Sequence, residues 1–268
     1  MVRVEGENNM YLVTGGAGFI GSHIVSRLAA MGERVRVLDN FSYGSAKNLG
    51  GLERRVETVS GNVVNPAVLR RAMAGVNVVF HQAGIRSVSL SMENPALVNQ
   101  INVEGTLTVL TAARDAGVRR VVFASSYLVY GNTKTMPQSE AQPPNPTTPY
   151  AVSKLAGEYY CKVFAELYGL ETVSLRYFDV FGPRQDTNPQ YPTVMDRFIG
   201  AALAGAPLEI HGDGLQSRDF TYIDNVVDAN LLAAENPEAV GEVFNVGQGR
   251  SITLLDVIDL LRPIVGPE

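Results

Sequence analysis

Tyr150 and Lys154 stand four residues apart at the start of a predicted helix. That spacing places both side chains on one face of the helix, one turn apart. An ammonium group beside a phenol favours the phenolate, so we expect the pKa of Tyr150 to be lowered. A tyrosine with a pKa nearer neutrality can take a proton from a substrate hydroxyl and return it. The spacing therefore indicates acid–base chemistry, although a Tyr-x-x-x-Lys pair alone also occurs by chance on surface helices.

Ser126 stands just beyond a predicted buried strand at 120–124. Ligands bind at the carboxyl edge of parallel sheets, where such strands end. The serine hydroxyl is therefore placed to hydrogen-bond the same substrate oxygen as Tyr150. Ser126, Tyr150 and Lys154 together form the predicted catalytic group.

Gly15, Gly18 and Gly21 follow a G-x-x-G-x-x-G spacing in the turn TGGAGFIG (14–21), which lies between the first predicted strand and the first predicted helix. Gly15 allows a tight turn, Gly18 lets a pyrophosphate approach the backbone, and Gly21 lets the helix pack closely against the strand. The amino end of the helix then offers free N–H groups and a partial positive charge. With the strand before it and the helix after it, the turn predicts a dinucleotide-binding site.

Asp39 ends the second predicted strand, 18 residues beyond Gly21. A carboxylate at this place can accept hydrogen bonds from both hydroxyls of the adenosine ribose. It would repel a 2′-phosphate. Asp39 therefore predicts NAD rather than NADP as the cofactor.

Apolar runs and helical segments alternate along the chain and must position these residues. Strands are predicted at 11–14, 35–39, 56–60, 76–81, 120–124 and 171–177, and helices at 20–31, 66–74, 95–116 and 150–168. The strands are apolar throughout, as expected where helices cover both faces of a parallel sheet. The predicted fold class is α/β, a Rossmann-type doubly wound parallel sheet over residues 1–177. Over residues 178–268, where prolines and glycines are more frequent, we expect a smaller mixed α/β region that binds substrate.

The composition is that of an ordinary globular protein, with 268 residues, 46% of them apolar and 18% charged. A net charge of −5 argues against a nucleic-acid-binding surface. Three histidines and the single cysteine, Cys161, predict no metal site and allow no intrachain disulfide. The sequence has neither a signal-peptide pattern nor an apolar run of about 18 residues, so we expect a cytoplasmic protein without a membrane span.

The motifs of the chain resemble those of the extended short-chain dehydrogenase/reductase family, and most closely its UDP-glucose (UDP-hexose) 4-epimerases. The motifs are TGGAGFIGSH (14–23), LDN (38–40), HQAG (81–84), NVEGT (102–106), FASSYLVYG (123–131), PYAVSKLAGE (149–158), LRYFDVFGPRQ (175–185) and GDGLQSRDFTYIDNVVDA (212–229). They follow the family order over essentially the whole chain. They are more specific for the superfamily than for one reaction.

The resemblance implies that NAD is the cofactor and that a UDP-sugar is the substrate. The residues implied for the cofactor are Gly15, Gly18, Phe19, Ile20, Gly21, Asp39, Asn40, Asn62, Val63, Ala83, Gly84, Arg86, Asn102, Tyr150, Lys154 and Tyr177. Those implied for the substrate are Arg86, Ser126, Tyr150, Asp179 and Arg218. Tyr150 is implied to be the acid/base, with Lys154 tuning it and holding the nicotinamide ribose, and with Ser126 assisting.

The reaction implied by the resemblance is 4-epimerisation: hydride leaves C4 of the sugar for NAD, the 4-keto sugar rotates, and the hydride returns to the other face. Relatives that eliminate water carry an acidic pair after the strand-end Ser or Thr, whereas Tyr127 and Leu128 follow Ser126. Two alternatives stay open. One is another nucleotide-sugar oxidoreductase, dehydratase or decarboxylase, and the other is a non-catalytic NAD-binding protein.

Three positions depart from the family pattern. Asp179 replaces an Asn, and its charge would repel a diphosphate unless Arg184 or Arg218 compensates. Asn62 replaces an Asp at the adenine edge. Tyr127, with Leu128 beside it, replaces small residues, and either narrows the sugar pocket or points into the core or a dimer contact.

The helices at 95–116 and 150–168 are apolar on more than one face. The additional apolar stripe is either core or, as the resemblance implies, an intersubunit four-helix bundle that makes a homodimer. Family members continue past residues 254–257. We therefore expect the second region to be truncated at its carboxyl end and to return in part to the first domain.

Overall fold

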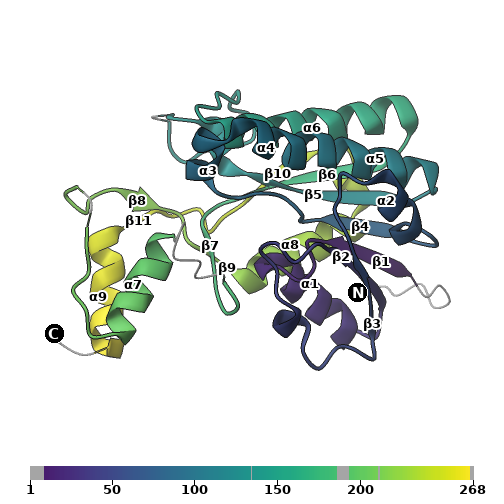
Figure 1. Ribbon diagram of the computed structural model, residues 1–268. Coiled ribbons are helices and arrows are strands. Elements are labelled where there is room, and N and C mark those ends of the chain that lie inside the picture. Colours follow the sequence, from purple (N-terminus) through teal and green to yellow (C-terminus); the bar gives the residue numbers. More distant parts are fainter. Residues whose placement is uncertain (1–8, 134, 186–192, 211, 266–268) are drawn as a thin grey trace.

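A seven-stranded sheet forms the centre of the computed structural model, which describes residues 9–133, 135–185, 193–210 and 212–265 (Figure 1). The strands lie in the order β10–β6–β5–β4–β1–β2–β3, and every neighbouring pair is parallel. Their bounds are β1 Met10–Thr14, β2 Arg34–Asp39, β3 Val56–Ser60, β4 Val78–His81, β5 Arg120–Ser126, β6 Glu171–Tyr177 and β10 Val243–Val246. The predicted doubly wound Rossmann-type sheet is confirmed.

Helices cover both faces of the sheet (Figure 1). One face packs against α1 (Phe19–Ala30) and α8 (Ile223–Glu235). The other packs against α2 (Pro66–Ala72), α5 (Gly105–Asp115) and α6 (Pro149–Tyr168). The second face also carries α3 (Val88–Glu93) and α4 (Pro95–Asn99), which contact α6.

Alternate residues of one strand enter different hydrophobic cores. In β1, Tyr11 and Val13 belong to the core beneath α1, whereas Met10 and Leu12 belong to the core beneath α2 and α5. Successive side chains of a strand point to opposite faces. Because both faces are covered, both sets are apolar, which explains the uninterrupted apolar runs in the sequence.

The predicted helix at 95–116 is not one regular helix. It consists of α4, a π-helical turn at Gln100–Glu104 and α5. Such turns insert a residue into an α-helix and often lie at functional sites. Here the turn contains the buried Asn102. The short helix α3, capped by the Ser87 side chain, was not predicted, and β5 continues to Ser126 rather than ending at residue 124.

Beyond Tyr177 the chain forms small elements. Strand β7 (Val180–Phe181) pairs in parallel with β9 (Thr221–Tyr222), and β8 (Ser217–Arg218) pairs antiparallel with β11 (Ile252–Thr253). Helices α7 (Val194–Leu203) and α9 (Leu254–Val265) pack around Phe198 and stand apart from the sheet in Figure 1. Between these elements, α8 and β10 return to the sheet. The division of the chain at residue 177 into two domains stays a prediction.

Within the described part of the chain, no helix is long and apolar enough to cross a membrane. Over the same residues, no group of three or more His, Cys, Asp or Glu side chains gathers where it could hold a metal ion. Cys161 is buried and has a free thiol.

Candidate active site

The glycine turn lies at the carboxyl end of β1 and leads into α1. Gly15 has a φ of +67°, and a Cβ atom there would lie 2.8 Å from the backbone nitrogen of Ala83. A Cβ on Gly21 would overlap the carbonyl oxygen of Gly15. Gly18 is the N-cap of α1, and no side chain caps this helix. The amide groups of Phe19, Ile20 and Gly21 at the start of α1 therefore fit a pyrophosphate.

The carboxylate of Asp39 closes the turn at the end of β2. Its Oδ2 accepts a hydrogen bond from the amide of Ala17 at 2.9 Å, and its Oδ1 accepts one from the amide of Phe41 at 2.8 Å. Each carboxylate oxygen keeps a further lone pair, so Asp39 fits two ribose hydroxyls as well. The glycine turn and Asp39 are thus joined into one site that suits NAD.

Two predicted cofactor residues stabilise turns with their own side chains. Asn40 accepts from the amide of Ser42 at 3.1 Å, and Asn62 accepts from the amide of Val64 at 3.2 Å. Val63 is buried beside Gly105, where a Cβ atom would lie 2.9 Å from the valine side chain. These residues lie at the carboxyl ends of β2 and β3.

Ser126, Tyr150 and Lys154 meet at the carboxyl end of β5. Helix α6 begins just before Tyr150 because Thr148 caps its first turn and Pro149 is its first residue. The Tyr150 hydroxyl lies near Ser126, whose side chain acts to lower the pKa of the phenol. The Lys154 Nζ donates to the carbonyl oxygen of Ala124 at 2.9 Å and lies 5.9 Å from the centre of the Tyr150 ring. The structure therefore brings the three predicted catalytic side chains together, and all three are buried.

The predicted lowering of the Tyr150 pKa is wrong: the residues of the protein raise this pKa. Burial raises the pKa of Tyr150 to about 12, against the smaller opposing effects of the hydrogen bond with Ser126 and the charge of Arg86. Burial lowers the pKa of Lys154 to about 8. Desolvation dominates because the ammonium group is directed at the Ala124 carbonyl rather than at the phenol.

Asn102 connects the loop after β4 to helix α6. Its Oδ1 accepts from the amide of Ile85 at 2.8 Å, and its Nδ2 donates to Ile85 O and to Ser153 Oγ, each at 3.0 Å. The Ser153 hydroxyl donates to the carbonyl oxygen of Tyr150 at 2.7 Å. A Cβ on Gly84 would lie 3.1 Å from Asn102 Oδ1 and 3.3 Å from Lys154 Nζ. Asn102 thus braces the catalytic helix.

A buried histidine without a predicted role lies beneath this loop. His81, the last residue of β4, has its Nδ1 2.7 Å from Thr14 Oγ1 and its Nε2 3.0 Å from Thr106 Oγ1. Because the Thr106 hydroxyl donates to Asn102 O at 2.6 Å, Nε2 is the donor and Nδ1 the acceptor. Burial lowers the pKa of His81 to about 3, so the ring is neutral. The histidine of the HQAG motif was the sequence signal for this chain of hydrogen bonds.

Tyr177 ends β6 and is buried next to helix α8. Its hydroxyl accepts from Asn230 Nδ2 at 2.8 Å and from Gln82 Nε2 at 3.1 Å. Burial raises the pKa of Tyr177 to about 12. Nothing in the sequence pattern marked Asn230, since its role depends on α8 returning to the sheet.

Two of the departures from the family pattern meet on the substrate side. Ser126 of β5 pairs in register with Tyr177 of β6, so the residues that follow these strands are neighbours. The ring of Tyr127 stacks on Phe178, with centroids 5.0 Å apart, and its hydroxyl lies near Asp179, whose charge acts together with burial, the larger cause, to raise the pKa of the phenol. Tyr127 therefore faces the site and not the core.

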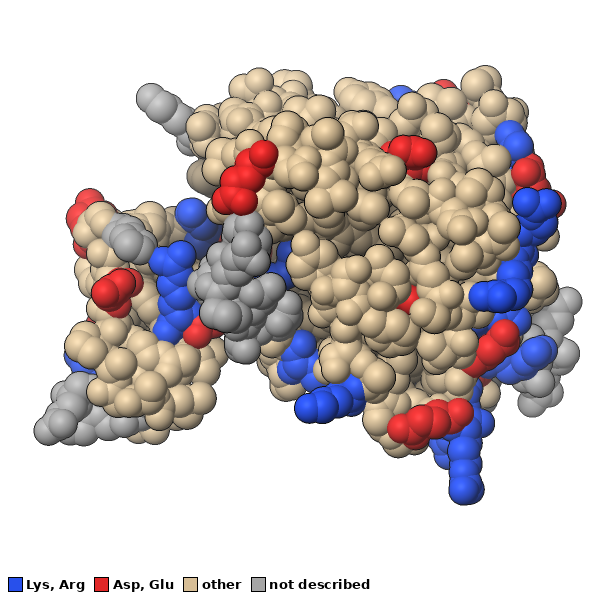
Figure 2. Space-filling model, viewed as in Figure 1, with Lys and Arg blue, Asp and Glu red and all other residues tan. Residues whose placement is uncertain are grey.

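Arg218 is the cation that faces Asp179, with Nε 3.7 Å from Oδ2. Arg184 does not compensate the charge of Asp179, because its guanidinium donates to the carbonyl oxygens of Ser22 and Asn48. Arg86 is exposed in the loop after β4, and its charge acts on Tyr150. Figure 2 shows Lys and Arg side chains both on the part that carries α7 and α9 and on the facing side of the main body.

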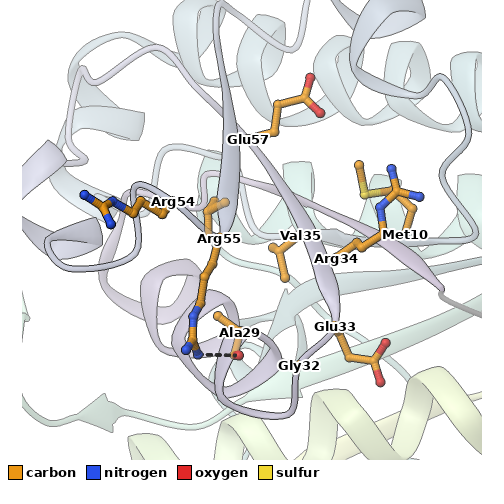
Figure 3. Close-up of a pocket in the computed structure, with 10 residues that line it drawn as sticks. Met10, Ala29, Gly32, Glu33, Arg34, Val35, Arg54, Arg55 and Glu57 are labelled. Carbon is orange, nitrogen blue, oxygen red and sulfur yellow. Dashed lines mark hydrogen bonds between the residues drawn. The ribbon is translucent and has the colours of Figure 1, made fainter.

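A cleft of about 560 Å³ lies at the other, amino edge of the sheet (Figure 3). Its lining includes Arg34, Arg54 and Arg55, but these side chains point in different directions, and Arg55 donates to the carbonyl oxygen of Ala29 at 3.5 Å. Since the cations do not converge and ligands of such sheets bind at the carboxyl edge, this cleft is not the candidate site.

Geometry alone defines the class of protein: a dinucleotide-binding fold of the short-chain dehydrogenase/reductase type, with a Ser–Tyr–Lys group beside the glycine turn. A model of the NAD dependent epimerase/dehydratase family matches residues 11–247. The chain therefore belongs to this family, as predicted, and is an NAD-dependent enzyme of the nucleotide-sugar group.

Three relatives illustrate the similarity. The chain is 43% identical over 260 residues to the UDP-glucose 4-epimerase of Mycolicibacterium smegmatis, which covers 95% of this chain and 82% of the relative. It is 36% identical over 241 residues to a UDP-N-acetyl-alpha-D-glucosaminuronate decarboxylase of Bacillus cytotoxicus, covering 88% and 74%. The crystal structure of the Thermotoga maritima UDP-glucose 4-epimerase with UDP-glucose matches with a TM-score of 0.90 at 38% identity, covering 96% of this chain and 82% of the other.

Proposed function

We propose that the protein is a UDP-hexose 4-epimerase of the UDP-glucose/UDP-galactose type. The observation that carries the proposal is that Ser126, Tyr150 and Lys154 lie together, buried, at the edge that holds the glycine turn, with Lys154 Nζ 5.9 Å from the centre of the Tyr150 ring. In this arrangement one oxygen of a sugar can contact both Tyr150, the proton acceptor, and Ser126, a hydrogen-bond partner. NAD supplies the acceptor and donor of the C4 hydride, and its oxidised ring adds a positive charge.

Tyr150 removes the proton of the 4-hydroxyl group and later returns it through the same oxygen. Ser126 fixes that oxygen by a hydrogen bond, and Lys154 provides a positive charge one helical turn away. Because burial raises the pKa of Tyr150, the phenol needs these charges in order to ionise near neutral pH. The polar side chains of Ser126 and Tyr150 thus act on the reacting hydroxyl while the sugar itself stays free to rotate.

The nucleotide part of the substrate provides binding energy remote from the reacting carbon. Arg218 and Arg86 are the cations that we assign to the diphosphate, and Asp179 lies beside Arg218. A nucleotide held at these places would anchor a sugar that turns over between the two hydride transfers.

Epimerisation is favoured over the alternatives by the residues that follow Ser126. Elimination of water needs an acid near the strand end, and Tyr127 and Leu128 occupy those positions. The carboxylate of Asp179, which follows the neighbouring strand β6, lies beside Tyr127 and Arg218. A non-catalytic binding role is disfavoured because Ser126, Tyr150 and Lys154 are all present and lie together.

We also propose a homodimer formed through helix α6. Its outer face exposes the apolar side chains of Val152, Tyr159, Val163 and Leu167, which are 52%, 59%, 40% and 71% exposed. Such a stripe, opposite the buried Tyr150 face, suits a four-helix bundle with a second copy. Multi-angle light scattering is expected to give twice the mass of the chain, and a monomer would contradict this proposal.

A product assay tests the reaction. The NAD-loaded protein is incubated separately with UDP-glucose, UDP-N-acetylglucosamine and UDP-glucuronic acid, and the products are identified by NMR. We expect the 4-epimer of at least one sugar, with UDP-glucose converted fastest, and none with the Tyr150→Phe variant. A 4-keto-6-deoxy sugar or release of carbon dioxide would identify the dehydratase or decarboxylase alternative instead. No product and no trapped NADH with any sugar would favour the non-catalytic alternative.

A further inference from the structure

Three side chains link the catalytic serine to the second region of the chain. Tyr127 follows Ser126, Asp179 stands between β6 and β7, and Arg218 belongs to β8. The Tyr127 hydroxyl lies near the carboxylate of Asp179, where it can act as a donor, and Asp179 Oδ2 lies 3.7 Å from Arg218 Nε. The side chain of Asp179 is 33% exposed and that of Arg218 is 48% exposed, so both are open to a ligand.

Arg218 cannot neutralise two anions at once. In the structure it faces Asp179, while the neighbouring carboxylate of Asp219 is occupied by the amides of Gln248 and Gly249 at 2.8 Å each. A diphosphate that reaches Arg218 therefore competes with Asp179 for the same guanidinium. The carboxylate would then keep Tyr127 as its hydrogen-bond donor.

We propose that Asp179 is a built-in competitor of the substrate diphosphate: Arg218 exchanges the Asp179 carboxylate for the diphosphate, Tyr127 retains that carboxylate, and the exchange is coupled to uptake of a proton by Asp179. This inference rests on the proposed function, which assigns the diphosphate to Arg218. It makes Tyr127 and Asp179 determinants of substrate affinity without a part in the proton transfer at C4.

The coupling to a proton follows from the charges that face Asp179. Burial, followed by the charge of Asp219, raises the pKa of Asp179, whereas Arg218 and the hydrogen bond from Tyr127 lower it. When Arg218 turns to a diphosphate, its lowering effect is withdrawn and a second anion is added. Both changes favour the protonated carboxyl group, so nucleotide binding should take up a proton.

Calorimetry with UDP alone tests the exchange without relying on turnover. Titrations in two buffers of different ionisation enthalpy give the number of protons taken up at neutral pH. For the wild type we expect net uptake and an affinity that rises as the pH falls, by up to about tenfold per pH unit. For Asp179→Asn we expect UDP binding about tenfold tighter, no proton uptake and little dependence on pH.

Two further variants separate the exchange from a general loss of charge. Asp115→Asn removes a surface carboxylate that is paired with Arg114 at 2.7 Å, and should leave UDP affinity unchanged. Tyr127→Phe should weaken UDP binding severalfold in the wild type but have no effect in the Asp179→Asn background, because the two residues act as a pair.

The outcomes distinguish this inference from the proposed function. If the wild type fails to bind UDP, both are overturned. If it binds UDP with the same affinity and the same proton balance as Asp179→Asn, only the exchange is overturned. Equal effects of Tyr127→Phe in both backgrounds would likewise overturn it.

Discussion

Replacing His81 by Gln should change how the stability of the protein depends on pH. His81 is 1% exposed and neutral, with Nδ1 accepting from Thr14 and Nε2 donating to Thr106. Burial lowers its pKa from 6.5 to about 3, whereas the unfolded chain keeps the ordinary value. Below pH 6.5 the unfolded state therefore binds more protons than the folded state, so stability present above that pH is lost as the pH falls toward 3.

The size of this loss can be worked out from the two pKa values of His81. Each pH unit between 6.5 and the folded value removes about 1.4 kcal/mol of stability, which amounts to about 3 kcal/mol at pH 4. Gln can still donate to Thr106 but does not titrate. We expect His81→Gln to cost about 1–2 kcal/mol at pH 7, from the lost acceptor for Thr14. The variant should then lose less on acidification, so that its stability overtakes that of the wild type between about pH 6 and pH 5.

Urea unfolding followed by circular dichroism between pH 7 and pH 4 measures the effect. Carboxylates also titrate in this range, so the quantity that matters is the difference in slope between the wild type and His81→Gln. His23→Gln is the matched control, because His23 is only partly buried and should give a smaller difference. Parallel curves for the wild type and His81→Gln would show that His81 is not held neutral, and the argument from burial would fail.

Three further outcomes follow from the site and the core. Tyr150→Phe should abolish turnover while NAD stays bound, whereas Lys154→Ala should weaken both turnover and NAD binding. Activity assays and the absorbance of retained NAD check this, and wild-type rates for Tyr150→Phe would contradict it. Gly21→Ala should lower the free energy of unfolding by about 1–3 kcal/mol and remove most of the NAD affinity, because its Cβ meets the Gly15 carbonyl. Gly200→Ala, in the open interior of α7, should instead raise the free energy of unfolding by about 0.5–1 kcal/mol. Thermal-shift assays with and without NAD measure both effects. Arg120→Met should lower the free energy of unfolding by about 3 kcal/mol, since it breaks the ion pair of the buried Arg120 with Glu171 and removes the side-chain donor to the Ala233 carbonyl oxygen. A loss below about 1 kcal/mol, measured by urea unfolding, would be evidence against this.

The first part of the sheet was predictable because its signals are local. The glycine turn at 14–21 restricts the backbone by itself, since Gly15 needs a positive φ and Gly21 leaves no room for a side chain. The strands beside it are apolar on both faces, and each pattern is contained in about six residues. Their mutual order then follows the usual doubly wound arrangement.

The elements that were missed depend on distant partners or are very short. Strand β10 joins the sheet by pairing with β6, from which it is separated by most of the second region. The strands β7, β8, β9 and β11 contain two residues each, too few to show a period. The π-helical turn at Gln100–Glu104 adds one residue to a helix without disturbing the apolar pattern around it.

The sequence predicts buried polar residues least well, because a charged side chain can be buried only where hydrogen-bond or ion-pair partners, which are often distant in sequence, surround it. Arg120, a charged residue next to another arginine, is 2% exposed and donates to the carbonyl oxygens of Ala233 and Asn236. The same reasoning explains the Tyr150 pKa. The sequence spacing correctly places Lys154 one turn from Tyr150. The loss of solvent at Tyr150, which spacing does not reveal, has the larger effect on the pKa of the phenol.

Strand order explains two departures from the family pattern that appear unrelated when each residue is considered alone. Taken singly, Tyr127 crowds the sugar pocket and Asp179 repels a diphosphate. In the sheet, β5 and β6 are neighbours with Ser126 opposite Tyr177, so the residues after the two strands must meet. The phenol of Tyr127 then lies near the carboxylate of Asp179. That carboxylate faces Arg218, which without Asp179 would be available to bind the diphosphate. The two substitutions are better understood as one change in how Arg218 is shared than as two separate losses of affinity.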